Sequence, residues 1–442
     1  MAMKVTHQVK FIKVEDLIPH PRNSRTHSEQ QVLEVANSIT EFGFTNPVLI
    51  DGQNHILAGH ARQLAAMQLG MTHVPVIQFN NFTPAQVRAY VIADNKLAEN
   101  AGWDKELLAI ELQEIQLLDD AFDLSLTGFK LPEIDLMLLD AQNDEENEDP
   151  PIPIVNSNKI VSQLGDVFQL GKHRLLCGNH LEQKDWKALM GRYRAHAVFA
   201  DPAYNVPIKG HVSGLGKVTH DEFAMASGEM SVDEFIEYLE TLIFYLTFYS
   251  RKGALHYICM DWRHQYELLT AARQLYHELK NICVWNKTNG GMGSLYRSKH
   301  EFVNVFKVGD APHINNVELG KHGRYRTNVW DYAGNNAFHK DRGEELLIHP
   351  TVKPVAMIAD AMLDCTHRNH LVVDPCVGSG STILAGEQTG RRVFAMELAP
   401  QYVDVSILRW QEAYGKDAVH EATGLTFNEL MQQRKEVSHG EG

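Results

Sequence analysis

Two apolar runs in this sequence end in residues that could bind a planar group carrying an amine. The first run, 197–199, leads into Ala-Asp-Pro-Ala-Tyr-Asn at 200–205. This is the position where a buried strand opens into a loop, and open α/β sheets bind their ligands there. Asp201 supplies an acceptor-only carboxylate, Pro202 removes a backbone donor, and Tyr204 supplies a flat ring. The stretch favours contact with a nucleobase amine, although Asp-Pro also begins ordinary turns.

The second run leads into Asp-Pro-Cys-Val-Gly-Ser-Gly-Ser-Thr at 374–382 and then into a helical pattern. A strand, a Gly-rich turn and a helix in this order indicate a nucleotide-binding βα unit. Gly378 and Gly380 allow positive φ and close approach of a ligand to the backbone. Glu397 ends the next apolar run, at the distance where an acidic residue usually accepts hydrogen bonds from ribose hydroxyls. Together the two stretches predict one site that binds a nucleotide-like cofactor beside a base.

The motifs resemble those of the β class of DNA amino-methyltransferases, over residues 160–415. Asp-Pro-Ala-Tyr resembles their Asp-Pro-Pro-Tyr signature, with Ala203 in place of the second proline, and Thr-Val-Lys-Pro at 351–354 resembles their Thr-Lys-Pro motif. The resemblance implies S-adenosyl-L-methionine as cofactor and no metal. It implies catalytic roles for Asp201, Pro202 and Tyr204. The cofactor residues that it implies are Asp374, Pro375, Gly378, Ser379, Gly380, Glu397, Thr351, Lys353, Pro354 and Asn179, the last standing where relatives often carry Asp.

The expected reaction is site-specific transfer of a methyl group to the exocyclic N6 of a flipped-out adenine. Asp201 and the Pro202 carbonyl would each accept an N–H, so that the nitrogen lone pair is aimed at the sulfonium methyl for direct displacement. Asp at the first position favours adenine, because relatives that methylate cytosine N4 usually begin with Ser. A cytosine-N4 enzyme remains an alternative. So does a DNA-binding or nucleotide-hydrolysing regulator in which the methyltransferase fold is a scaffold. Cys376 is expected to pack within the cofactor loop.

Residues 1–115 form a smaller α/β pattern of two short strands, a helix at 59–69 and a further strand at 74–77. The helix begins with Gly59 and carries Arg62, and such a helix start can bind an anion. This pattern resembles the N-terminal domain of ParB-like partition proteins, which implies nucleotide binding at Gly59 and Arg62. A solvated Arg62 on a module that contacts DNA or a partner is the alternative.

An acidic stretch between 132 and 153 contains no Lys or Arg and ends in Pro-Pro-Ile-Pro. We expect its first part to complete a helix and 142–153 to be a disordered acidic linker. The expected domains are therefore 1–115, ParB-like; 116–158, a helix and the linker; 159–430, the methyltransferase; and 431–442, a polar tail. For 159–430, alternating strand and helix patterns predict an α/β Rossmann-like, doubly wound sheet with a late hairpin and a helix at 266–279.

The formal net charge is −15, which argues against a uniformly basic nucleic-acid binder. Residues 280–332 are an exception, with eight Lys and Arg against four Asp and Glu. Tyr296, Arg297, Lys299 and Lys287 are candidate contacts to DNA, which we expect to be double-stranded. The Gly-rich segment 210–218 is expected to be a mobile flap over the substrate pocket.

The remaining composition bounds the setting of the protein. Five scattered cysteines without a Cys-x-x-Cys pair suggest neither a disulfide framework nor a zinc site. No apolar run approaches the ~20 residues needed to span a bilayer, and the start lacks the apolar core of a signal peptide. The expected location is the cytoplasm of a bacterium, with a bacterial or phage gene and association with the nucleoid. Restriction-modification is the expected context, and a homodimer is left open.

Overall fold

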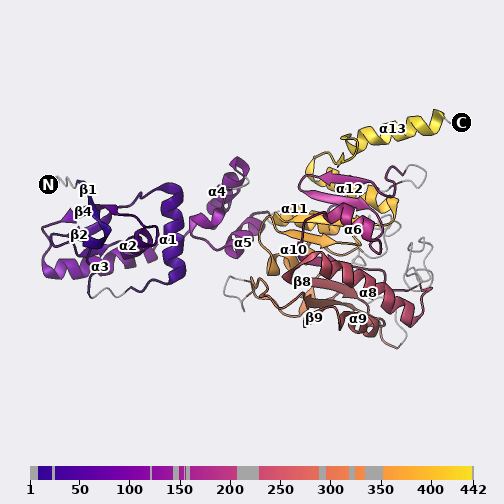
Figure 1. The fold of residues 1–442 in the computed structure, drawn as a ribbon, viewed down its shortest axis with the longest axis horizontal. Coiled ribbons are helices and arrows are strands. Elements are labelled where there is room, and N and C mark those ends of the chain that lie inside the picture. Colours follow the sequence, from indigo (N-terminus) through magenta and orange to yellow (C-terminus); the bar gives the residue numbers. More distant parts are fainter. Residues whose placement is uncertain are drawn as a thin grey trace. The chain divides into compact units, whose positions relative to one another are not determined.

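The computed structural model describes residues 8–21, 25–119, 122–142, 149–153, 155, 160–206, 228–287, 295–317, 324–333 and 352–440. The chain divides into two compact units, Met1–Gln142 and Asn143–Gly442, each with its own sheet (Figure 1). Residues 143–148 of the acidic stretch lie outside the described residues, as do the expected flap at 210–218 and Thr351. Within the described ranges, no helix is both long and apolar enough to cross a membrane.

The first unit is built on a four-stranded sheet in the order β1-β4-β2-β3. Its strands are β1 (Val9–Lys13), β2 (Val48–Asp51), β3 (Ile56–Ala58) and β4 (His73–Phe79). Alternate residues of the strands, among them Val48, Ile50 and Val76, are buried in one core. The unit also contains helices α1 (Glu29–Phe42), α2 (His60–Gln68) and α3 (Pro84–Glu99). Gly59 precedes α2 with a φ of 101°, a left-handed conformation that suits glycine.

Two further helices end this unit, α4 (Lys105–Leu118) and α5 (Leu131–Gln142), with a short 3-10 turn at Leu124–Thr127 between them. They have a small core of their own, in which Leu112, Leu124, Ile134 and Leu138 are buried. The segment 116–158 therefore contains the end of one helix and the whole of another before the acidic stretch begins.

The second unit is a ten-stranded sheet in the order β11-β9-β10-β8-β7-β12-β13-β6-β5-β14. β7, β8, β12, β13 and β6 are parallel to their neighbours in this series, as the doubly wound prediction requires. The strands are β5 (Val167–Leu170), β6 (His173–Cys177), β7 (Ala195–Ala200), β8 (Ser250–Met260), β9 (Glu278–Asn286), β10 (His300–Lys307), β11 (Val329–Asp331), β12 (Leu371–Asp374), β13 (Arg392–Glu397) and β14 (Val419–His420).

Helices cover both faces of this sheet, so that its central strands are buried on both sides (Figure 1). In β7, Ala197 and Phe199 belong to one core and Val198 and Ala200 to the other. The first core is completed by α10 (Val355–Cys365), α11 (Ser381–Thr389), α12 (Pro400–Tyr414) and α13 (Phe427–Gly440). The second is completed by α6 (Gln183–Met190), α8 (Val232–Phe248) and α9 (Gln265–Ala272). Continuous apolar runs are typical of such strands.

The late hairpin is confirmed, because β9 and β10 pair in antiparallel fashion. The helix expected at 266–279 is wrong in its second half. Helix α9 ends at Ala272, and β9 begins at Glu278 to pair with β10. Tyr276, between the two elements, stacks on Phe306 of β10 with ring centroids 4.5 Å apart. Tertiary pairing here overrides a local helical pattern.

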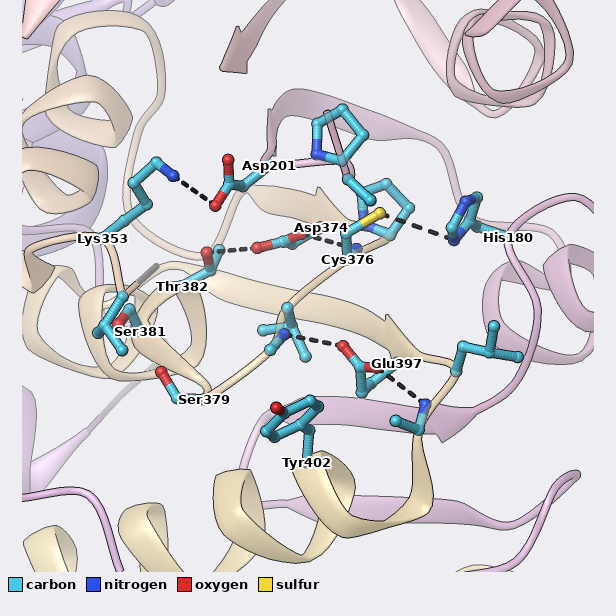
Figure 2. Close-up of a pocket in the computed structure, with 18 of the residues that line it drawn as sticks. His180, Asp201, Lys353, Asp374, Cys376, Ser379, Ser381, Thr382, Glu397 and Tyr402 are labelled. Atoms are coloured by element: carbon cyan, nitrogen blue, oxygen red, sulfur yellow. Dashed lines mark hydrogen bonds and ion pairs between the residues drawn. The ribbon is translucent and has the colours of Figure 1, made fainter. Parts of the chain in front are cut away.

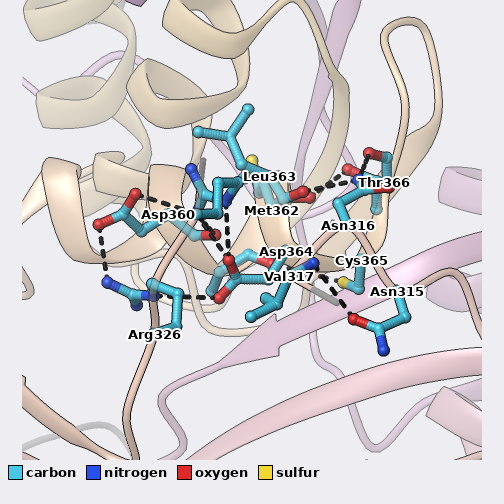
Figure 3. Close-up of polar contacts among 12 residues, drawn as sticks. Asn315, Asn316, Val317, Arg326, Asp360, Met362, Leu363, Asp364, Cys365 and Thr366 are labelled. Atoms are coloured by element: carbon cyan, nitrogen blue, oxygen red, sulfur yellow. Dashed lines mark hydrogen bonds and ion pairs between the residues drawn. The ribbon is translucent and has the colours of Figure 1, made fainter. Parts of the chain in front are cut away.

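Helix α10 is held by polar contacts from the segments 315–317 and 324–326 (Figure 3). The Asn316 amide donates to the carbonyls of Leu363 and Thr366 at 2.7 and 2.8 Å, which satisfies carbonyls at the end of the helix. Arg326 donates to Asp360 and Asp364 at 3.0 and 3.3 Å. These contacts fix the helix that follows Lys353.

Both arginines of the segment 324–326 donate to Asp364. The Arg324 side chain is 4% exposed and donates to Asp364 Oδ1 at 2.6 Å, while Arg326 donates to Oδ2. Burial raises the pKa of Asp364, and the two guanidinium groups oppose that rise. A carboxylate with two buried cationic partners is costly to neutralise.

We expect Asp364→Asn to destabilise the protein by about 2 kcal/mol, because Arg324 and Arg326 lose a buried negative partner while Asp360 remains. The melting temperature of the full chain measures the effect. Asp310→Asn is the matched control, since Asp310 pairs with Lys252 at the surface, with both side chains more than 70% exposed. Equal melting temperatures for the two variants would contradict the role given to Asp364.

Candidate active site

A cavity of about 530 Å³ opens where β7, β12 and β13 end. The three strands are parallel neighbours, so their carboxyl ends meet at one edge of the sheet. Asp201 follows the last residue of β7, and Asp374 and Glu397 are the last residues of β12 and β13. All three line the cavity (Figure 2). β7 is also where the sheet order reverses, which is the usual ligand position in this architecture.

The loop after β7 is fixed by its own side chains. Asn205 has a φ of 54°, and its side-chain oxygen accepts from the backbone N–H of Gly228 and Met230 at 3.0 and 3.1 Å. Within the loop, the Tyr204 hydroxyl donates to Asp201 Oδ1 at 2.6 Å. Pro202 is buried and lines the cavity. The Asp-Pro-Ala-Tyr stretch therefore presents a carboxylate, a carbonyl-bearing turn and a ring on one wall.

Lys353 donates to Asp201 Oδ2 at 2.5 Å, and Figure 2 shows its side chain directed at that carboxylate. Burial raises the pKa of Asp201, and the nearby charge of Lys353 lowers it only in part. The pKa of Lys353 lies above its usual range, because the charges of Asp201 and Glu301 outweigh burial. The ammonium group is thus held charged against a buried carboxylate.

Glu301, the second residue of β10, belongs to the same cluster although it does not line the cavity. Its Oε2 lies 3.2 Å from Lys353 Nζ and 3.3 Å from the Tyr204 hydroxyl, and its Oε1 pairs with Lys287 Nζ. Burial opposes its ionisation, yet the charges of Lys353 and Lys287 lower the pKa of Glu301 to about 2. Two carboxylates and two ammonium groups thus form one buried cluster.

The Gly-rich turn after β12 is shaped by Glu397 and α12. Glu397 accepts from the backbone N–H of Gly378 at 3.0 Å and of Ala399 at 2.8 Å. Gly380 has a φ of 86°, and an added Cβ there would lie 3.0 Å from Ser406 Oγ. The turn can therefore approach α12 only with glycine at this position.

Asp374 and Cys376 also line the cavity. Asp374 accepts from the Cys376 backbone N–H at 2.9 Å and from the Thr382 hydroxyl at 2.5 Å, and burial raises its pKa to about 7. The Cys376 sulfur is 3.6 Å from His180 Nδ1 (Figure 2). Burial raises the pKa of the Cys376 thiol well above its usual range, so that the reactive thiolate is disfavoured.

Three family models match the sequence. The DNA methylase model of N6 and N4 enzymes covers 195–408, a ParB-methyltransferase helix-turn-helix model covers 106–163, and a ParB N-terminal domain model covers 2–95. The ParB-like nuclease domain-containing protein YnaK of Escherichia coli (strain K12) is 44% identical over 79 residues, which are 18% of this chain and 91% of YnaK. The second unit belongs to the N6/N4 DNA methylase family over 195–408, and the first carries a ParB-like N-terminal domain.

Type II methyltransferases are similar to the second unit. M2.MboI of Moraxella bovis is 27% identical over 169 residues, which are 36% of this chain and 57% of M2.MboI. M2.DpnII of Streptococcus pneumoniae is 24% identical over 262 residues, 58% of this chain and 90% of that protein. Among solved structures, the cytosine-N4-specific PvuII DNA methyltransferase has a TM-score of 0.42 at 13% identity and covers 58% of this chain and 89% of its own.

Most of the predicted catalytic and cofactor residues line the cavity of the methyltransferase unit. They are Asp201, Pro202, Tyr204, Lys353, Asp374, Pro375, Gly378, Ser379 and Glu397. Gly380 and Pro354 lie beside it as the residues that precede α11 and α10. Asn179 is absent from the lining, and its side-chain oxygen accepts from the Leu181 backbone N–H at 2.9 Å. This oxygen has a second lone pair, and the expected contact of Asn179 with the cofactor's adenine stays a prediction.

The candidate DNA contacts fall into two groups. Tyr296, Arg297 and Lys299 lie in the segment before β10, and Tyr296 is 84% exposed. Lys287 differs from them, because its ammonium group pairs with Glu301 and lies 4.5 Å from the centroid of the Trp285 ring. Lys287 is therefore part of the cluster around Asp201.

In the ParB-like unit, Arg62 folds back beside Gly59 instead of extending from the helix. Its guanidinium donates to the backbone carbonyls of Asn46 and Pro47, both at 2.8 Å. Burial lowers the pKa of Arg62, with Asp94 and Tyr90 opposing the change. These contacts are those of a residue that stabilises its own domain, and nucleotide binding at this position stays a prediction.

Sequence reasoning missed Glu301 and the cavity residues His180, Tyr238 and Tyr402. Glu301 is the second residue of a strand that mixes apolar and polar positions, which is a common pattern with no chemical signature. The Tyr238 hydroxyl is hydrogen-bonded to His180 Nε2 at 3.1 Å. In the sequence, Tyr238 occupies one of the buried positions of helix α8, and nothing there indicates a polar role. Only the sheet order and helix packing bring these residues to the site.

Proposed function

We propose that this protein transfers a methyl group from S-adenosyl-L-methionine to the exocyclic N6 amine of adenine in DNA. The observation that carries the proposal is the joint position of Asp201 and Glu397 in one cavity, at the ends of strands that flank β12. One carboxylate suits a base amine and the other suits ribose hydroxyls. A single cavity can therefore hold the donor and the acceptor of the methyl group.

The residues of the cavity fit S-adenosylmethionine in charge and polarity. Carboxylates suit its positive charge and its ribose hydroxyls, and an apolar wall of Ile160, Leu164, Val377, Leu398, Pro400 and Tyr402 suits its adenine ring. Glu397 would accept from the ribose, while Asp374 and the Gly-rich turn would hold the remainder. When bound, this cofactor supplies an electrophilic methyl group on a positively charged sulfur.

Asp201 and the Pro202 carbonyl would each accept one N–H of the target amine. These contacts orient the nitrogen lone pair toward the methyl group and stabilise the positive charge that develops on nitrogen. The nitrogen would gain the methyl group as the bond between that carbon and the sulfonium sulfur breaks, which leaves S-adenosylhomocysteine as a neutral thioether, and the proton that the nitrogen loses would pass to solvent. Because Cys376 has a raised pKa and lies in the cofactor turn, we assign it no nucleophilic role.

Adenine is preferred to cytosine as the base, since the motif begins with Asp201 and resembles that of adenine enzymes. The family includes N4 enzymes, so a cytosine-N4 enzyme is the second candidate. In duplex DNA the base must leave the helix, and Tyr204 is placed to stack on it. The helix-turn-helix match at 106–163 and the exposed Tyr296 support a DNA partner. Arg297 and Lys299 would neutralise phosphates.

The test is transfer from labelled S-adenosylmethionine to unmethylated double-stranded and single-stranded DNA, followed by digestion to nucleosides. We expect N6-methyladenine as the labelled product. N4-methylcytosine would retain the mechanism and overturn the choice of base. No labelled nucleoside on either DNA would overturn the proposed activity and favour a regulator that acts through its ParB-like domain.

A further inference from the structure

Both oxygens of the Asp201 carboxylate already accept hydrogen bonds in this structure. Oδ1 accepts from the Tyr204 hydroxyl at 2.6 Å, and Oδ2 accepts from Lys353 Nζ at 2.5 Å. An incoming amine must share one of these oxygens or displace its donor. This competition for Asp201 rests on the proposed methyl transfer, because only that reaction requires Asp201 to accept a hydrogen bond from a base amine.

A displaced donor in a buried site needs another acceptor close by. A buried ammonium group without a partner is strongly unfavourable, and a buried hydroxyl without an acceptor is also unfavourable. The side chain of Lys353 is 5% exposed, so water is not a ready substitute. Whatever receives Lys353 and Tyr204 must already lie within the cluster.

Glu301 Oε2 is that acceptor. It lies 3.2 Å from Lys353 Nζ and 3.3 Å from the Tyr204 hydroxyl, so one oxygen is within reach of both groups that occupy Asp201. Its side chain is 13% exposed, and it is placed by the pairing of β10 with β8 and β9. A small shift of Lys353 Nζ or of the Tyr204 hydroxyl would move its hydrogen bond from Asp201 to Glu301.

Lys287 keeps Glu301 in place during such an exchange. It pairs with the other oxygen, Oε1, and lies against the face of Trp285. Lys353 is also near the Trp285 ring, 5.9 Å from its centroid. Oε2 can therefore gain a hydrogen bond while Oε1 remains engaged.

We propose that Glu301 is a positioning residue, the alternate acceptor that takes the hydrogen bonds of Lys353 and Tyr204 when the target amine binds Asp201. Glu301 does not touch the reacting atoms. It acts through Lys353 and Tyr204, and it allows Asp201 to change partners without leaving a buried charge unpaired.

The test compares Glu301→Gln with the wild-type full chain in single-turnover methyl transfer. Glutamine keeps the shape of the side chain and loses its charge. We expect the rate to fall on the order of 10²-fold, with the affinity for S-adenosylmethionine changed less than about threefold. Glu267→Gln is the matched control, a buried glutamate of α9 outside the cavity, and should retain the wild-type rate.

Two further measurements separate this role from a general loss of structure. The Lys353→Met variant has no ammonium group that could move to Glu301. In that background, we expect the fold-loss in rate caused by Glu301→Gln to be less than about a third of the loss in the wild-type background. The charge of Glu301 also contributes to raising the pKa of Asp201, after burial. The acid limb of the rate should therefore move to lower pH in Glu301→Gln.

A wild-type rate in Glu301→Gln, an equal loss in both backgrounds, or an unmoved acid limb would overturn the role of Glu301. Each of these outcomes presumes methyl transfer by the wild-type protein. Absence of transfer by the wild-type protein would instead overturn the proposed function, and the role of Glu301 with it.

Discussion

Replacement of Asp201 by asparagine is expected to lower the rate of methyl transfer by about 10³-fold. The amide has the shape of the carboxylate, but one of its two atoms donates and it carries no charge. It therefore has one accepting oxygen in place of two, and it does not stabilise positive charge on the target nitrogen. The measurement is the single-turnover rate with labelled S-adenosylmethionine and saturating DNA.

Asp261→Asn is the control for this variant. Asp261 directly follows β8, the strand next to β7, and accepts from His264 at 2.9 Å without lining the cavity. We expect it to retain the wild-type rate. Both variants should bind the cofactor as the wild type does. Asp201→Asn activity within tenfold of the wild type would contradict the role assigned to the carboxylate.

Replacement of Glu397 by alanine is expected to weaken S-adenosylmethionine binding by about 10²-fold. The variant removes the proposed acceptor of the ribose hydroxyls. It also leaves the N–H groups of Gly378 and Ala399 without the carboxylate that orders the Gly-rich turn. Calorimetric titration with the cofactor measures the loss, and titration with DNA should show little change.

The matched control is Glu412→Ala, an exposed glutamate on α12, which should alter neither titration. An equal loss of cofactor and DNA affinity in Glu397→Ala would show that Glu397 supports the whole unit and not one ligand.

The parts of the site that could be predicted from sequence are those encoded locally. Asp201, Asp374 and Glu397 each stand at the end of an apolar run, and hydrophobic periodicity followed by turn residues locates a strand end. Parallel strands in a doubly wound sheet present such ends at one edge. A shared cavity therefore followed from short stretches of sequence and one rule of architecture.

The rest depends on partners that are far apart in sequence. Glu301 reaches Lys353 only because β10 lies two strands from β7 in the sheet order. Lys287 was expected to contact DNA on the basis of local charge, and its pairing with Glu301 has no local signal. The shortened helix α9 has the same origin, since the partner strand of β9 decides where the helix ends.

Helix α10 connects the cluster around Asp201 with the polar contacts from 315–317 and 324–326. Its eleven residues span about 16 Å. Lys353 lies just before its first turn. The far end of the helix accepts hydrogen bonds from Asn316, Arg324 and Arg326. A helix held by contacts at both ends moves as one rigid element. We infer that a displacement of 315–317 or 324–326 by a bound macromolecule would move α10, and with it the Lys353 ammonium group at Asp201, so that binding of the macromolecule and the state of the catalytic carboxylate are coupled.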